Sequence, residues 1–179
     1  MKSKFVSLGA VGVAAAMLAS APALGASTLT IPPASAFAMK VVALHNRTRA
    51  GAGVAPLYWD HSLARAADGY AAELARTGRW GHSAPSSRVG QGENLWKGTR
   101  GAFAVDHMIG AWASEQQLYR PGTFPQISRN GNWEQVGHYT QMIWPGSLRV
   151  GCAIRSSPRE DYFVCRYSPA GNVLGVALR

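Results

Sequence analysis

The chain has 179 residues, which is the size of a single domain, and Lys and Arg outnumber Asp and Glu by 18 to 9. Most of the formal net charge of +9 comes from arginines scattered between Arg47 and Arg179, with no basic cluster, so the composition argues against nucleic-acid binding. A long-range attraction to anionic envelope polymers or lipid head groups stays open, as does a soluble basic protein with no such partner.

The N-terminal residues have the order of a secretory signal peptide. Lys2 and Lys4 precede an uncharged apolar stretch over residues 5–18, and small residues follow it. This stretch is shorter than the roughly 20 residues that cross a bilayer, which argues against a membrane anchor. We therefore expect a signal peptide over residues 1–26 and a mature chain that is secreted or periplasmic.

The expected domain begins after a short linker. Residues 27–36 include a Pro-Pro pair and form the predicted linker, and residues 37–179 form the predicted single domain. An Ala-Ser-Ala sequence at 34–36 is an alternative, later cleavage site that the sequence leaves open. No second apolar stretch is long enough to span a membrane, so we expect no membrane span.

Two helices are predicted at the start of the domain. In the first, apolar residues recur at helical spacing from position 37 onwards, and a Gly-Ala-Gly run at 51–53 ends the pattern. The second begins after Asp60, a favourable N-cap residue, and ends at Gly78, a favourable residue at a helix C-terminus. Its apolar stripe consists of Leu63, Ala66, Ala67, Tyr70, Ala71 and Leu74.

The middle of the chain is predicted to hold a third helix between loops. Residues 80–101 are rich in Gly, Ser and Pro, which indicates a long loop with at most one short strand. The third helix is predicted over 102–119, and a loop follows over 120–131. The pattern over 136–144 fits a helix or a strand, and the sequence does not decide between them.

Two strands, over 149–155 and 161–167, are predicted to form an antiparallel hairpin with a turn near 157–159. Cys152 and Cys165 lie at equal distances from the centre of this turn. An exported protein with two cysteines usually joins them in one disulfide, so we expect this pair to be bridged. Three or four helices followed by a hairpin indicate an α+β layered domain.

Recognisable catalytic motifs are absent from these 179 residues, which contain no GxSxG, HExxH or P-loop sequence. Among the five histidines, His82 and His138 each follow a glycine in a predicted loop or boundary segment. Glu93 also follows a glycine, and Glu115 lies three residues after Trp112 on the third predicted helix. Spacing alone predicts no site here, and each histidine on its own is best interpreted as a hydrogen-bonded structural residue.

Six short motifs, in order along the chain, resemble those of the CAP superfamily. This group has the SCP domain and comprises cysteine-rich secretory proteins, antigen 5 and pathogenesis-related proteins. The motifs are HNxxR at 45–49, GHS at 81–83, GENL at 92–95, WxxExxxY at 112–119, GHYTQMIW at 137–144 and YFVCRYSPAGNV at 162–173. By this resemblance the chain is identified as a bacterial, secreted type of CAP protein.

The resemblance implies an α-β-α sandwich, in which helices flank an antiparallel sheet, with one open cleft. It also implies that the side chains of His82, Glu93, Glu115 and His138 converge in this cleft. Two neutral imidazoles can bind Zn²⁺ or another divalent cation, and nearby carboxylates can fix their tautomers. Because His82 and His138 would be the only metal ligands, we expect the cation to be weakly bound.

The resemblance leaves three functions open. We expect a monomeric extracellular binding module for a lipid, a sterol or an envelope ligand, without enzymatic activity. The alternative is a metal-dependent, protease-like hydrolase that uses the same cleft, for which the sequence assigns no catalytic residue. The third is a structural role, in which the four side chains form a buried hydrogen-bond network. Since the chain has one cysteine pair and no cysteine-rich tail, we expect no ion-channel regulation.

Overall fold

The computed structural model describes residues 35–178 of the chain. The predicted signal peptide over 1–26 lies outside these residues, as does most of the predicted linker over 27–36. Among the helices that are described, none is long and apolar enough to cross a membrane.

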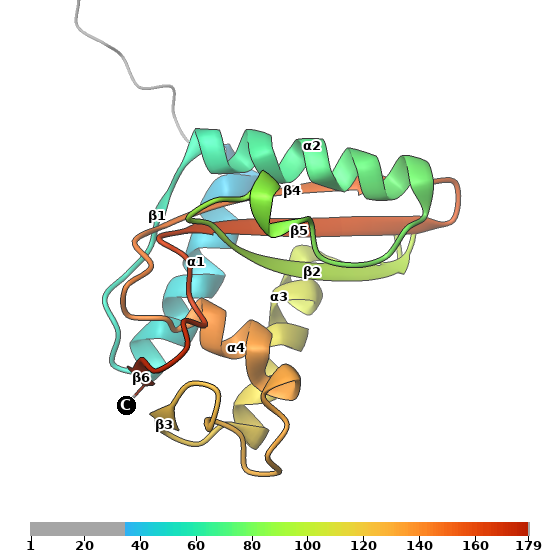
Figure 1. Ribbon diagram of the computed structural model, residues 1–179. Coiled ribbons are helices and arrows are strands. Elements are labelled where there is room, and N and C mark those ends of the chain that lie inside the picture. Colours follow the sequence, from blue (N-terminus) through green and yellow to red (C-terminus); the bar gives the residue numbers. More distant parts are fainter. Residues whose placement is uncertain (1–34, 179) are drawn as a thin grey trace, which may run out of the picture. The chain divides into compact units, whose positions relative to one another are not determined.

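The described part of the chain has three layers, with a sheet between two sets of helices. Figure 1 shows α2 (His61–Thr77) on the upper face of the sheet. The helices α1 (Ala36–Gly51), α3 (Val105–Ser114) and α4 (Gly137–Met142) lie below it. This arrangement confirms the predicted α+β sandwich.

The main sheet has four strands in the order β1-β4-β5-β2. The long strands β2 (Gly92–Thr99), β4 (Arg149–Ser156) and β5 (Glu160–Ser168) pair in an antiparallel manner, as expected. The sheet is nevertheless mixed, because the two residues of β1 (Tyr58–Trp59) pair in parallel with β4 as the chain passes from α1 to α2. A second, small sheet joins β3 (Gly122–Thr123) to β6 (Ala177–Leu178).

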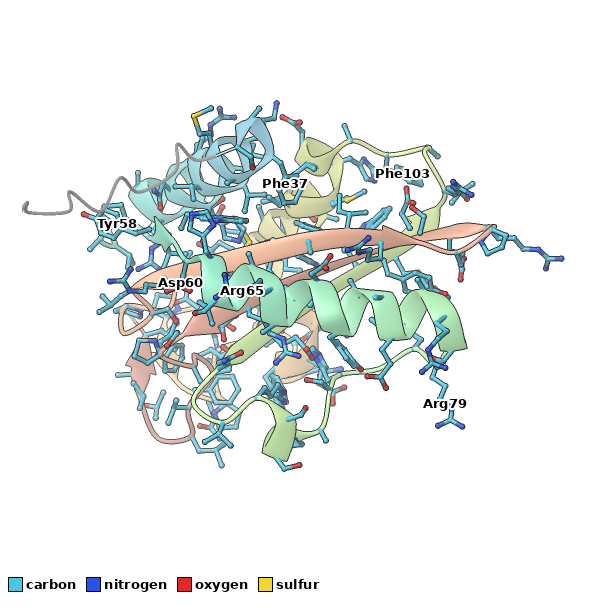
Figure 2. All side chains as sticks on the ribbon, turned by 90° about the horizontal axis from the view of Figure 1, so that it is seen from above. Phe37, Tyr58, Asp60, Arg65, Arg79 and Phe103 are labelled. Atoms are coloured by element: carbon cyan, nitrogen blue, oxygen red, sulfur yellow. A yellow bond between two sulfur atoms is a disulfide. The ribbon has the colours of Figure 1, made fainter. Side chains whose placement is uncertain are left out.

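The ends of α2 confirm the signals that the sequence contains. The Asp60 carboxylate accepts hydrogen bonds from the backbone N–H groups of Ser62 and Leu63, at 2.8 and 3.0 Å. Gly78 ends the helix with φ 68°, a left-handed conformation that glycine adopts without strain. Figure 2 shows Asp60 at one end of this helix and Arg79 beyond the other.

The middle of the chain differs in part from the sequence prediction. The segment over 80–101, predicted as a loop with room for one short strand, contains β2, a strand of eight residues, together with a 3₁₀ helix at Pro85–Ser87. The helix predicted over 102–119 is shorter, because α3 ends at Ser114 and tightens into the 3₁₀ helix Glu115–Leu118. The segment over 136–144 is helical, with α4 preceded by the 3₁₀ helix Trp133–Val136.

The hairpin of β4 and β5 carries the expected disulfide. Cys152 and Cys165 are directly opposite in the strand register, with Cα atoms 4.1 Å apart, and their sulfur atoms are bonded. The prediction from their equal distances to the turn is therefore confirmed.

Alternation along β5 divides the core between the two faces of the sheet. Phe163, Cys165 and Tyr167 face α1 and α3, where they join the larger core cluster. Tyr162 and Val164 face α2, where they pack against its alanines and Leu74. A charged residue, Arg166, occupies the next position on this second face and is 3% exposed. Its partner in the strand register is Glu93 of β2.

Candidate functional site

Two histidine–glutamate pairs join segments that are far apart in the sequence. His82 lies in the loop after α2, and its Nδ1 is 2.8 Å from Oε1 of Glu93 on β2. His138 lies in the first turn of α4, and its Nδ1 is 2.6 Å from Oε1 of Glu115. Each imidazole is therefore held by a carboxylate from another element.

A cavity of about 400 Å³ brings three of the four predicted residues together. His82, Glu93 and His138 line this cavity. Glu115 does not; it lies with His138 in the wall of a neighbouring, more open pocket. Thus His138 lies between the cavity and the Glu115 carboxylate, which holds the imidazole ring of His138.

Glu93 is the more buried of the two carboxylates, with 1% of its side chain exposed against 19% for Glu115. Its oxygens accept hydrogen bonds from the Ser83 N–H and hydroxyl at 3.0 and 2.9 Å, and form an ion pair of 3.0 Å with Arg166. Burial raises the pKa of Glu93, but the hydrogen bond from His82 and the charge of Arg166 oppose it. With the Ser83 contacts added, the pKa of Glu93 is held below its ordinary value, so this carboxylate is ionised at neutral pH.

Glu115 fixes the position of His138. Its Oε2 accepts hydrogen bonds of 3.0 Å from the backbone N–H groups of His138 and Tyr139, in addition to the contact between Oε1 and the ring. Trp112 stacks on the His138 ring, with the ring centroids 5.9 Å apart and the planes inclined by 15°. Because Trp112 and Glu115 are three residues apart on one helical segment, both can reach the same imidazole.

The carboxylates determine which nitrogen of each imidazole is available. A ring that donates its Nδ1 proton to a carboxylate carries its lone pair on Nε2 when it is neutral. The Nε2 atoms of His82 and His138 are then the two nitrogen donors that the cavity offers to a divalent cation, and this set fits a weak site. Within residues 35–178, no group of three or more His, Cys, Asp or Glu side chains is placed to hold a metal ion.

The residues that support Glu93 are not evident from the motifs. Arg166 lies directly opposite Glu93 in the register of β2 and β5. The Ser83 hydroxyl lies between them, where it accepts a hydrogen bond of 3.0 Å from Arg166 and donates one to Glu93. This hydroxyl therefore contacts the carboxylate and not the adjacent imidazole. One sequence signal could have indicated this support: Arg166 is a charged residue at an inward position of a predicted strand.

A second buried network lies behind the cavity and centres on His45. Its Nε2 accepts a hydrogen bond of 2.8 Å from the Tyr167 hydroxyl, and its Nδ1 donates one of 2.9 Å to the carbonyl of Val41. Asn94 donates to the same hydroxyl and to the carbonyl of His138, at 3.2 and 3.1 Å. Burial lowers the pKa of His45 to about 4, so the ring is neutral and serves the packing of α1.

Comparisons with known proteins agree with this architecture. The family model described as "CAP: Cysteine-rich secretory protein family" matches residues 42–167. Pathogenesis-related protein 1C of Nicotiana tabacum is 38% identical over 133 residues, which cover 73% of this chain and 74% of that protein. Glioma pathogenesis-related protein 1 of Mus musculus is 32% identical over 156 residues, which cover 82% of this chain and 58% of that protein.

Solved structures show the same fold at lower identity. The crystal structure of NaASP2 with Zn²⁺ superimposes with a TM-score of 0.63 at 23% identity, and the match covers 80% of this chain and 85% of the other. At this level of identity, the likeness supports the shared α-β-α architecture and nothing finer.

Proposed function

The chain belongs to the cysteine-rich secretory protein family, and we propose that it is a secreted binding protein whose cavity holds a divalent cation weakly between His82 and His138. One observation carries this proposal: both imidazoles line a single cavity, and each has its Nδ1 hydrogen-bonded to a carboxylate. Such contacts orient a histidine and make it a better metal ligand.

Two observations support an extracellular location. The family is described as secretory, and the Cys152–Cys165 disulfide is a bond that persists in oxidising compartments. The periplasmic location and the bacterial type expected from the sequence stay predictions, because the relatives named above come from a plant and an animal.

Zn²⁺ is the cation that we propose first, because imidazole nitrogen is among its preferred ligands. NaASP2, which shares the fold, has a crystal structure with Zn²⁺. When bound, the cation would supply positive charge and open coordination positions to the cavity. His82 and His138 would hold it, and Glu93 and Glu115 would keep their rings in place.

The side chains around the cavity favour binding over hydrolysis. The Ser83 hydroxyl donates its proton to Glu93 and accepts a hydrogen bond from Arg166, so it is not paired with an imidazole that could act as its general base. Glu93 has a lowered pKa and a full set of partners, which makes it a weak base. The metal-dependent hydrolase is therefore the alternative, and it would need another base, such as the exposed Glu134 on the cavity wall.

The proposed ligand is a lipid, a sterol or an envelope component with a polar group. The more open pocket beside the cavity has a volume of about 320 Å³ and is lined by Trp80, Trp96 and Trp112. Since His138 lines both this pocket and the cavity, an apolar surface of indole rings adjoins a polar recess. This arrangement suits a ligand with an apolar body and a polar head.

Calorimetric titration of the mature protein with Zn²⁺ at pH 7.5 and pH 5.5 tests the proposal. We expect weak binding at pH 7.5 and weaker binding at pH 5.5, because ligation requires unprotonated imidazoles. The variant His82→Ala/His138→Ala should lose this binding. The variant His61→Ala should keep it, because His61 is exposed on α2 and does not line the cavity.

Unchanged zinc binding in the double variant would contradict the proposed cation site. Turnover of peptides or esters should be measured in parallel with zinc present. Zinc-dependent turnover that both His138→Ala and Glu93→Gln abolish would replace the binding function with the hydrolase.

A further inference from the structure

The side chain of Arg88 contributes a positive charge to the same cavity. It follows the 3₁₀ helix Pro85–Ser87, and its half-buried side chain lines the cavity together with His82 and His138. Its Nε donates a hydrogen bond of 3.2 Å to the carbonyl of Ser83, and its Nη1 donates one of 3.2 Å to the carbonyl of Gln91. The guanidinium is thus anchored to the backbone of the loop that carries it.

The charge of Arg88 has no ionic partner within residues 35–178. The buried carboxylate of the cavity wall, Glu93, is already paired with Arg166. A guanidinium has five N–H donors, and the two contacts to backbone carbonyls leave Arg88 with donors to spare. Its charge and its remaining donors are therefore available to a molecule in the cavity.

The other carboxylates near the cavity do not neutralise Arg88. Glu115 faces away, because its oxygens are taken by the ring of His138 and by two backbone N–H groups. Glu134 lines the cavity but is exposed to solvent, where water and salt screen its charge. Arg88 is consequently the cavity-lining charge most able to act on a bound group.

We infer that Arg88 selects a ligand with an anionic oxygen group, a carboxylate or a phosphate, which it binds beside the two imidazoles. A planar guanidinium matches the paired oxygens of either group and forms charge-assisted hydrogen bonds with them. The inference rests on the proposed binding function and deepens it, since an anionic oxygen can also complete the coordination of a cation held by two histidines. A cavity of about 400 Å³ has the size of a small-ligand site.

Three probes of similar shape separate charge from apolar contact: benzoate, phenyl phosphate and the neutral benzamide. Their binding to the mature, ¹⁵N-labelled protein is followed by amide shifts in NMR spectra, with and without Zn²⁺. We expect at least one of the two anions to bind about tenfold or more tightly than benzamide, because hydrogen bonds to a charged group are the stronger ones. Whichever anion binds more tightly identifies the ligand's polar group.

Two arginine variants form the matched pair. The change Arg88→Gln should reduce anion affinity about tenfold or more and leave the affinity for benzamide unchanged. The change Arg65→Gln removes the same charge from the exposed face of α2 (Figure 2) and should leave all three affinities unchanged. Far-UV circular dichroism and a thermal unfolding midpoint equal to those of the unmodified protein show that each variant is folded.

Equal binding of the anions and benzamide would overturn the inference, as would equal losses in the two arginine variants. The titrations without Zn²⁺ distinguish the role of Arg88 from the proposed cation site. Zinc binding without anion preference would leave the proposed function standing and remove the role of Arg88. Anion preference that is lost in Arg88→Gln, in a protein that does not bind zinc, would support Arg88 and overturn the proposed cation site.

Discussion

Glu93 and Arg166 form a buried ion pair beneath the cavity, with 1% and 4% of their side chains exposed. Removing two charges from water is costly, and their attraction offsets that cost only when the remaining hydrogen-bonding groups are also satisfied. Ser83 and His82 supply the remaining hydrogen bonds to the Glu93 carboxylate. Loss of Arg166 would therefore leave an uncompensated charge in the interior.

We predict that Arg166→Met lowers the free energy of unfolding by about 3–5 kcal/mol at pH 7. Urea unfolding followed by circular dichroism measures this change. The variant Arg166→Met/Glu93→Gln lacks the unpaired charge and should be more stable than Arg166→Met alone. Equal stability of the two variants would show that lost packing, and not charge, explains the effect.

His45 makes the stability of the protein depend on pH. Burial lowers its pKa to about 4, whereas the unfolded chain has the ordinary value of 6.5. Between these two values the unfolded chain binds a proton that the folded protein does not, so stability is full above pH 6.5 and falls as the pH falls towards 4. Over this whole range, His45 lowers the free energy of unfolding by about 3 kcal/mol.

Urea unfolding at pH 7, 5.5 and 4 tests this prediction through a comparison with His45→Gln. The variant is expected to be less stable at pH 7, because the hydrogen bonds to Val41 and Tyr167 are disturbed. It should also lose less stability between pH 7 and pH 4 than the unmodified protein. Parallel pH profiles for the two proteins would exclude His45 as the source of the dependence.

Two elements, α2 and β4, approach each other closely at Gly151. A Cβ atom at this position would overlap the backbone of Asp60 and Ala64 at the start of α2. Backbone atoms cannot move aside as the end of a flexible side chain can, so the contact requires a residue without a side chain. The distance between the helix and the sheet depends on this glycine.

We predict that Gly151→Ala destabilises the protein by about 1–3 kcal/mol, the typical cost of overpacking. Gly69 is the matched control, because it lies within α2 and a Cβ there would meet no atom within 4 Å. Gly69→Ala should stabilise the protein by about 0.5–1 kcal/mol through helix propensity. Thermal unfolding of both variants measures the two changes in stability. A Gly151→Ala protein as stable as the unmodified one would contradict the close approach of α2 to β4.

In the molecule as a whole, the candidate site depends on contacts that hold the helices α1 and α4 together below the sheet. The guanidinium of Arg49 on α1 donates hydrogen bonds to the backbone carbonyls of Ala55, Met142, Trp144 and Ser147. Burial lowers the pKa of Arg49 to about 10, which still leaves it protonated at neutral pH. It ties the end of α4 to α1, and α4 carries His138 in its first turn. The HNxxR motif therefore supports the site through packing.

The sequence by itself determined the features that arise from neighbouring residues. Asp60 and Gly78 define α2, because capping depends on hydrogen bonds and backbone conformations within one helical turn. The hairpin and its disulfide could be predicted because Cys152 and Cys165 are spaced evenly about one turn. The resemblance to a family supplied the four candidate site residues, which spacing alone did not.

Only the tertiary structure decided how these residues meet. The sequence allowed one short strand within 80–101 but did not predict the length and position of β2, because its inward residues include polar ones such as Glu93, whose partners come from other elements. The contact of Glu93 with Arg166 depends on the register of two strands, and the place of Glu115 behind His138 depends on the packing of α4. Register and packing are settled by burial across the whole sheet, so no local pattern contains them.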